Sequence, residues 1–151
     1  MEKNIQKIVI ELMKSDDIKN VVEVETKCFT VPWHEESFIQ ELNNNVALYL
    51  VAKVEEKAVG YVGVWKILNE GHITNIAVHP NYRNKGIGRA LVSELLLLCT
   101  KDGIETFTLE VRKSNLIAQK LYKDFGFVEA GIRKKYYSDN NEDAIIMWKT
   151  I

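Results

Sequence analysis

A short segment with two glycines and three cations is the part of the sequence best suited to bind an anion. It runs through Arg83, Asn84, Lys85, Gly86, Ile87, Gly88 and Arg89. Glycine lets the backbone approach a bulky group closely, and the helix predicted to follow presents unpaired N–H groups at its start. The three cations add positive charge, so the segment is typical of a site for a phosphate-bearing ligand.

The order of residues in this segment argues against two common nucleotide sites. An NTPase phosphate loop needs a lysine directly after its last glycine, whereas Lys85 precedes Gly86. A dinucleotide fingerprint needs a third glycine where Leu91 stands, and a run of parallel strands. No zinc site is expected either, because the three histidines lack ligand spacing and cysteine companions. They are expected at the surface or in turns: His34, His72 and His79.

The composition is that of an ordinary globular protein. Apolar residues make up 46% and charged residues 27% of 151 residues, which fits one domain spanning residues 1–151. The formal net charge of -1 gives no reason to expect a nucleic-acid or membrane partner. Cys28 and Cys99 are far apart in apolar helical stretches, which favours reduced core residues and a cytoplasmic location. Neither Met1 to Met13 nor Leu95 to Leu98 has the pattern of a signal peptide or a membrane span.

Hydrophobic periodicity predicts the elements that position the glycine segment. Strands are expected over residues 5–12, 46–54, 58–68, 72–78 and 106–111, with a last hairpin of residues 127–137 and 144–151. Helices are expected from an N-cap at Ser15, from a cap at His34, over residues 87–101, and from Ser114 or Asn115 to Gly126. A turn is expected at residues 69–71. The order β-α-α-β-β-β-α-β-α-β-β indicates an α/β sheet with mixed strand directions.

Three side chains on these elements are candidates for chemistry. Phe107, Leu109 and Val111 share one face of their strand, so Glu110 lies on the other face and outside the core. Glu25 falls on the apolar face of the first helix, where a carboxylate needs either a buried donor or a place on a ligand-facing wall. Both alternatives stay open. Tyr122 recurs with apolar residues at helical spacing, which is the pattern of a core aromatic residue.

The glycine segment and the strand before it resemble the acetyl-coenzyme A site of the GNAT N-acetyltransferase superfamily. The pattern is Arg83-x-x-Gly86-x-Gly88 after Asn75-Ile76-Ala77-Val78, and the element order matches along the whole chain. Three further stretches are similar to the ribosomal-protein-alanine N-acetyltransferase (RimI) group: Phe29 to Trp33, Leu109 to Asn115, and Arg133 to Tyr137 with Glu142 to Met147. His34 departs from the serine cap usual in that group. The resemblance implies a GNAT fold: a mixed, mostly antiparallel sheet flanked by helices and splayed between its fourth and fifth strands.

This resemblance implies which residues bind the donor. Backbone N–H groups from Asn84 to Arg89 would hold the pyrophosphate of acetyl-coenzyme A, with Arg83 and Lys85 nearby. The preceding strand would pair with the pantetheine arm, and Asn115 would hold the arm from the other side. No metal is implied. The expected donor-binding residues are Ile76, Ala77, Val78, Arg83, Asn84, Lys85, Gly86, Ile87, Gly88, Arg89 and Asn115.

The implied reaction is direct transfer of an acetyl group from the thioester to an amine. Only a neutral amine attacks. Near neutral pH, deprotonation costs an α-amine (pKa about 8) about 1 kcal/mol and a lysine amine about 4 kcal/mol. The resemblance implies that Glu110 takes the proton, directly or through water, and that Tyr122 protonates the leaving thiolate. The implied acceptor is the N-terminal alanine of a small-subunit ribosomal protein. Its expected wall is Glu25, Phe29, Trp33 and Tyr137.

Two other functions fit the same scaffold. An acetyltransferase for a small amine, such as a polyamine or an aminoglycoside, would need a closed acidic pocket. A silent acyl-coenzyme A sensor would not need an acid and a base, whereas Glu110 and Tyr122 are both present. A monomer is expected in each case.

Overall fold

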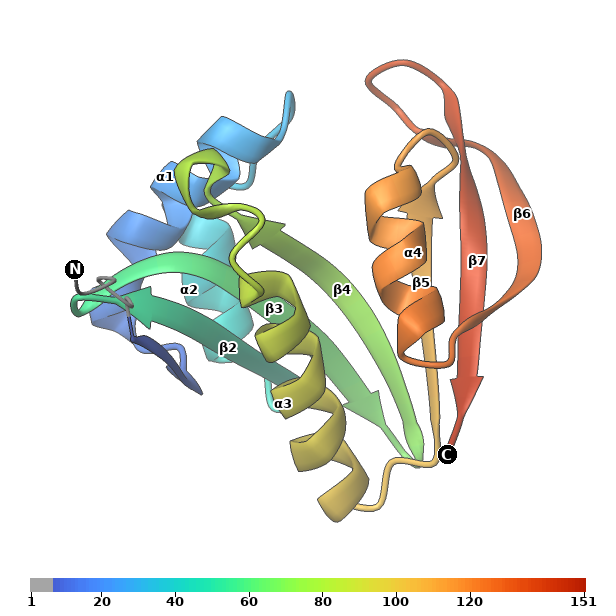
Figure 1. Cartoon of the computed structure of the whole chain (residues 1–151), viewed down its shortest axis with the longest axis horizontal. Coiled ribbons are helices and arrows are strands. Elements are labelled where there is room, and N and C mark those ends of the chain that lie inside the picture. Colours follow the sequence, from blue (N-terminus) through green and yellow to red (C-terminus); the bar gives the residue numbers. More distant parts are fainter. Residues whose placement is uncertain (1–6) are drawn as a thin grey trace, which may run out of the picture.

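One seven-stranded sheet runs through residues 7–151, the part of the chain that this computed structural model describes (Figure 1). Its strand order is β1-β2-β3-β4-β5-β7-β6. The elements are β1 (Ile8–Leu12), α1 (Ile18–Cys28), α2 (Glu35–Leu42), β2 (Ala47–Val54), β3 (Lys57–Ile67), β4 (Glu70–Val78), α3 (Ile87–Lys101), β5 (Thr106–Arg112), α4 (Leu116–Asp124), β6 (Val128–Tyr137) and β7 (Glu142–Thr150). The predicted order of helices and strands is confirmed. Residues 5 and 6 of the predicted first strand lie outside the described residues.

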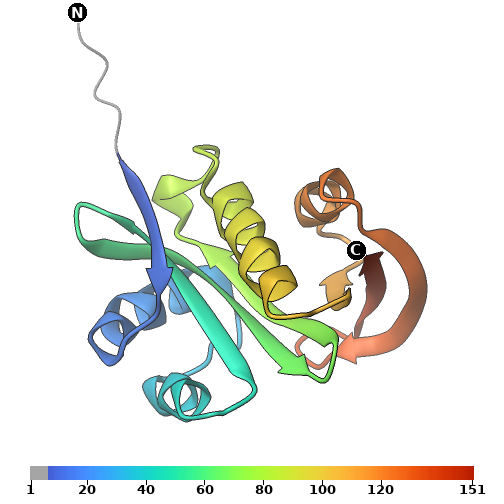
Figure 2. The same cartoon turned by 90° about the horizontal axis from the view of Figure 1, so that it is seen from below.

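The helices cover the two faces of the sheet in pairs. Figure 2 shows α1 and α2 on one face and α3 and α4 on the other. Each pair encloses its own hydrophobic core: Leu91, Leu95 and Phe107 lie in the larger one, under α3 and α4, and Val21 and Phe38 lie in the smaller one. Burial of this apolar surface is the main force that fixes the helices on the sheet.

Strand β4 is irregular at its centre and pairs unequally on its two sides. It pairs with β3 along its whole length, with a register shift that leaves Thr74 without a partner opposite Gly63 and Val64. A Cβ atom on Gly63 would lie 2.3 Å from the Tyr49 ring, so glycine is required there by close packing. On the other side, β4 pairs with β5 in parallel only at residues 70–72.

Beyond those three rungs β4 and β5 diverge, as Figure 1 shows. Strand β4 continues to Val78 and β5 to Arg112, where β5 pairs only with β7. The predicted splay between the fourth and fifth strands is therefore confirmed.

Some local predictions are wrong. Ser15 is not an N-cap: it begins a short 3-10 helix, and the Asp17 carboxylate accepts the N–H of Lys14 instead. The turn expected at residues 69–71 is shifted, because Glu70 and Gly71 already belong to β4.

One of the two cysteines is placed differently from expectation, and one histidine is placed as expected. Cys28 is only half-buried at the end of α1, whereas Cys99 lies in the core as predicted, and both thiols are free. His79 lies in the tight turn after β4, as one of its two expected placements has it, and it is buried there with its Nδ1 accepting the N–H of Asn81.

Candidate active site

The start of α3 forms a cradle of free N–H groups. Asn84 and Gly86 have left-handed backbone conformations, with φ of 63° and 81°. The first bond of the helix runs from the N–H of Ala90 to the carbonyl of Gly86, and the N–H groups of residues 84–89 have no acceptor within residues 7–151. Consecutive N–H groups at a helix start bind anions well, because they add to the positive end of the helix dipole.

The three cations of the segment surround this cradle but already have protein partners. The Arg89 guanidinium pairs with Asp124 of α4. Arg83 turns back to donate to the Val78 carbonyl and to Cys28 Sγ. Lys85 Nζ lies 5.5 Å from the centre of the Tyr82 ring. The cations therefore supply a positive field, while the backbone N–H groups are the donors available to an anion.

The splay leaves one edge of β4 open next to the cradle. Residues 73–78 have no strand partner on the β5 side, so their backbone can pair with an extended ligand. Asn115 lies across the gap as the N-cap of α4, where its Oδ1 accepts the N–H of Ala118. The structure thus brings the predicted segments 76–78 and 84–89 and Asn115 to the two sides of one opening.

Glu110 lies on β5 just above the last rung shared with β4. Its side chain is only 11% exposed, and its two oxygens have different partners. His72 Nε2 lies 2.7 Å from Oε2, and Arg133 Nε lies 3.2 Å from Oε1. The hydrogen bond with His72 holds the pKa of the Glu110 carboxyl below its usual range, against the opposing effect of burial, and Arg133 acts in the same direction. Glu110 is therefore an ionised carboxylate that can accept a proton.

Tyr122 is a core-facing residue of α4, on the opposite side of β5 from Glu110. It is 4% exposed and shares the larger core with Leu109 and Val111, and its ring packs edge-on against Phe127 at 5.7 Å. Burial raises the pKa of the Tyr122 phenol well above its usual value, so the group stays protonated and can only donate.

Glu25 has buried hydrogen-bond donors beside it, which agrees with the first of the two alternatives for this carboxylate. It is 2% exposed, and its carboxylate accepts hydrogen bonds from the Tyr61 hydroxyl and from the Trp33 N–H. Burial raises its pKa, while these two bonds oppose the shift. These contacts fix the α1–α2 loop on β3, and a direct contact with substrate stays a prediction. The other expected wall residues, Phe29, Trp33 and Tyr137, are half-buried.

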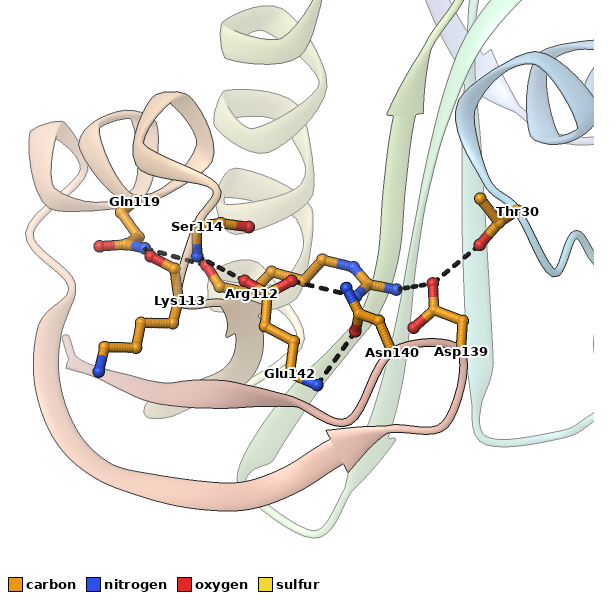
Figure 3. Close-up of polar contacts among 8 residues, drawn as sticks. All are labelled: Thr30, Arg112, Lys113, Ser114, Gln119, Asp139, Asn140 and Glu142. Atoms are coloured by element: carbon orange, nitrogen blue, oxygen red, sulfur yellow. Dashed lines mark hydrogen bonds and ion pairs between the residues drawn. The ribbon is translucent and has the colours of Figure 1, made fainter.

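A polar bridge joins the α1–α2 loop to the β6–β7 turn at the open end of the splay (Figure 3). Thr30 Oγ1 donates to Asp139 Oδ2 at 2.8 Å, and Arg112 Nη2 donates to the same oxygen at 2.8 Å. Arg112 also lies 4.0 Å above the Tyr137 ring. The two segments that flank the approach to Glu110 are therefore tied together.

Sequence reasoning missed the partners of Glu110. The expectation for His72 is the surface or a turn, whereas its half-buried side chain lies in β4 on the last rung shared with β5. Its partner there is Thr108, two residues before Glu110. The parallel pairing was the signal that could have found it, once the register was known. Arg133 gave no such signal, because it comes from an edge strand that is not next to β5.

Two negative findings apply to the described part of the chain. Within residues 7–151, no group of three or more His, Cys, Asp or Glu side chains is arranged to hold a metal ion. Over the same residues, no helix combines the length and the apolar character needed to cross a membrane.

Comparison with known proteins places this geometry among acetyltransferases. The sequence profile described as the acetyltransferase (GNAT) family matches residues 18–127. A Bacillus subtilis protein, named provisionally as a ribosomal protein bS18-alanine N-acetyltransferase, is 44% identical over 96% of this chain and 97% of its own length.

Solved structures agree with this comparison. The crystal structure of the ribosomal-protein-S18-alanine N-acetyltransferase from Escherichia coli has a TM-score of 0.89 and 35% identity, and the match covers 96% of this chain and 94% of that one. An N-acetyltransferase from Thermoplasma acidophilum, solved in complex with coenzyme A, has the same fold, with a TM-score of 0.81 at 20% identity over 96% and 99% of the two chains.

Proposed function

The chain belongs to the acetyltransferase (GNAT) family, and we propose that it transfers the acetyl group of acetyl-coenzyme A to the N-terminal α-amine of a protein. The observation that carries the proposal is the open edge of β4, with the N–H cradle at one end and the ionised Glu110 at the other. The names of the relatives support a ribosomal protein with an N-terminal alanine as the acceptor.

The donor site fits the chemistry of acetyl-coenzyme A. The N–H groups of residues 84–89 match a pyrophosphate, which has many acceptor oxygens and no donor. Residues 76–78 have no strand partner on the β5 side and would pair with the amide groups of the pantetheine arm in the manner of an added strand. Two groups of this edge would have to exchange their present partners, because the Ile76 N–H donates to Asn75 Oδ1 and the Val78 carbonyl accepts from Arg83. Asn115 lies where it can contact the arm from the α4 side.

In the proposed reaction the neutral acceptor amine attacks the thioester carbonyl. The C–N bond forms as the amine adds to give a tetrahedral intermediate, and the amine proton goes to Glu110 directly or through water; the C–S bond then breaks as the intermediate collapses. Tyr122 gives a proton to the departing thiolate, as the resemblance to the family implies, and its raised pKa keeps the phenol protonated near neutral pH. A base with a lowered pKa suffices here, because an α-amine is nearly neutral at physiological pH.

The acceptor enters between the α1–α2 loop and the β6–β7 hairpin. Phe29, Trp33 and Tyr137 provide half-buried aromatic surface along this route, and Glu25 supports the wall from below. We further propose that residues 1–151 act as a single monomeric domain in the cytoplasm, which the two free thiols support.

The proposal is tested by incubating the protein with acetyl-coenzyme A and three acceptors. These are a peptide that begins with alanine, the same peptide with a blocked N-terminus and an internal lysine, and spermidine. Mass spectrometry should show acetylation of the free N-terminus only. Turnover on spermidine alone would identify a small-amine acetyltransferase, and binding of coenzyme A without turnover on any acceptor would identify a sensor. Mass spectrometry of protein N-termini in cells that lack this protein would then identify the natural acceptor.

A further inference from the structure

We propose that Arg133 is a positioning residue that holds the Glu110 carboxylate in the geometry that proton transfer requires. The inference rests on the base role proposed above for Glu110, and it adds a residue from the far edge of the sheet to the reaction.

Arg133 reaches Glu110 across an intervening strand. Strand β7 lies between β5 and β6, and its residue Ala144 is paired with Arg133 on one side and with Arg112 on the other. Residues paired across neighbouring strands lie on the same face, and alternate residues of one strand do too, so Arg133, Ala144 and Glu110 share a face. Glu110 itself is paired with Ile146, so the Arg133 side chain runs diagonally across β7 and ends with Nε 3.2 Å from Glu110 Oε1.

The backbone of β6 changes its course directly after Arg133. The pairing with β7 is irregular between Arg133 and Tyr137, and Lys135 has a left-handed conformation with φ of 54°. The N–H of Lys135 donates to Asp143 Oδ1 at 2.9 Å, which ties the irregular segment to β7. Bulges of this kind re-aim side chains near active sites, and this one begins directly after Arg133, whose side chain reaches Glu110.

Several titratable groups face Glu110, and the Arg133 guanidinium adds a permanent charge to them. His72 faces the carboxylate from β4, Arg133 from β6, and the phenols of Tyr136 and Tyr137 lie within its field. Because His72 and Arg133 engage different oxygens, the carboxylate cannot rotate freely. Each oxygen keeps a second lone pair for the incoming proton. A guanidinium stays charged at every pH at which such an enzyme works, so this restraint is permanent.

The test is a double-mutant cycle with a charge-matched control. Arg133→Gln removes the charge, Arg133→Lys keeps it, and Lys134→Gln removes an equal charge from the next exposed position of the same strand. Steady-state rates with the Ala-starting peptide are measured for these variants, for Glu110→Gln, and for the double variant Glu110→Gln/Arg133→Gln. Thermal unfolding of each variant verifies the fold.

Arg133→Gln is expected to lower kcat about tenfold with little change in the KM for acetyl-coenzyme A, since orientation of the base is part of its effect. Arg133→Lys should recover part of the loss, and Lys134→Gln should match the wild type. In the Glu110→Gln background, Arg133→Gln should cost nothing further, because its effect passes through Glu110.

The outcomes separate the two proposals. If Arg133→Gln matches the wild type, or if its cost persists in the Glu110→Gln background, Arg133 is not a positioning residue for Glu110. If Glu110→Gln itself retains full activity, the proposed base is wrong, and the positioning role falls with it.

Discussion

Three glycines at or near the ends of α3 allow the donor site to be tested separately from the fold. Gly86 and Gly103 both need φ values above 80°, at 81° and 92°, and a Cβ atom at either would meet nothing within 4 Å. Gly88 lies inside the first turn of α3, where a Cβ atom would meet only Leu121 at an ordinary 3.5 Å. Because the three positions differ in backbone conformation, alanine should change the melting temperature differently at each.

The expected stability changes have opposite signs. A left-handed conformation costs an alanine about 1 kcal/mol relative to glycine, so Gly86→Ala and Gly103→Ala should each lower the melting temperature by about 3 °C. Gly88→Ala should raise it by about 1 to 2 °C, because alanine favours a helix by about 0.5 kcal/mol. The variants should rank differently in their affinity for coenzyme A. Gly86→Ala and Gly88→Ala should weaken it about tenfold, or about 1.4 kcal/mol, because a methyl group at either position would crowd the N–H groups that are proposed to hold the pyrophosphate.

Calorimetric titration with coenzyme A and thermal unfolding without it measure the two quantities independently. Gly103→Ala is the control for strain, since it lies at the other end of the helix and should bind coenzyme A like the wild type. A Gly88→Ala variant that is more stable and binds coenzyme A normally would refute the assignment of the pyrophosphate to this cradle.

Three further variants test the catalytic groups and the acceptor side. Glu110→Gln should lower kcat about a hundredfold in the peptide assay. Because the pKa of Glu110 is lowered by folding, its carboxylate stabilises the fold above the unfolded-state pKa of about 4.3 and loses this effect as the pH falls through the folded-state pKa. Melting temperatures measured between about pH 3 and 6 should thus fall less steeply on acidification in Glu110→Gln, and equal slopes would contradict the ion pair. Tyr122→Phe should lower kcat about tenfold without loss of stability, and unchanged rates would return Tyr122 to a purely structural role. Thr30→Val removes the hydrogen bond to Asp139 and should raise the KM for the peptide by at most about fivefold. Thr30→Ser keeps the hydroxyl group and should leave this KM unchanged. An equal effect of Thr30→Val on the KM for acetyl-coenzyme A would contradict a role at the acceptor side.

Local chemistry made most of the fold predictable from the sequence. The cap of α2 is at His34 as expected, and Trp33 and Phe38 pack together around it with ring centres 5.4 Å apart. The alternation of Phe107, Leu109 and Val111 with polar residues matches the burial of β5. Ser15 failed as a cap because the helical turn already begins at it: Lys14 is the N-cap of the 3-10 helix, and the Asp17 carboxylate accepts the Lys14 N–H.

The candidate site was predictable only where it depends on consecutive residues. The cradle of residues 84–89 follows from glycine spacing and a helix start, and both are local. The partners of Glu110 depend on strand order and register, which place His72 beside it and aim Arg133 at it over another strand. Such long-range pairings leave no period in the sequence, and the bridge from Thr30 to Asp139 joins residues 109 positions apart.

The brief contact between β4 and β5 has a consequence for how ligand binding and folding are linked. Only three rungs join the strands on either side of the opening. An extended ligand that pairs along residues 76–78 would serve as a temporary strand and complete the hydrogen bonding that the polypeptide leaves unmade. The donor would then be both a reactant and a structural part, and at a hundred times its dissociation constant it would stabilise the fold by about 2.7 kcal/mol. Each round of acetyl transfer would loosen and re-form the middle of the sheet as one coenzyme A leaves and the next acetyl-coenzyme A arrives.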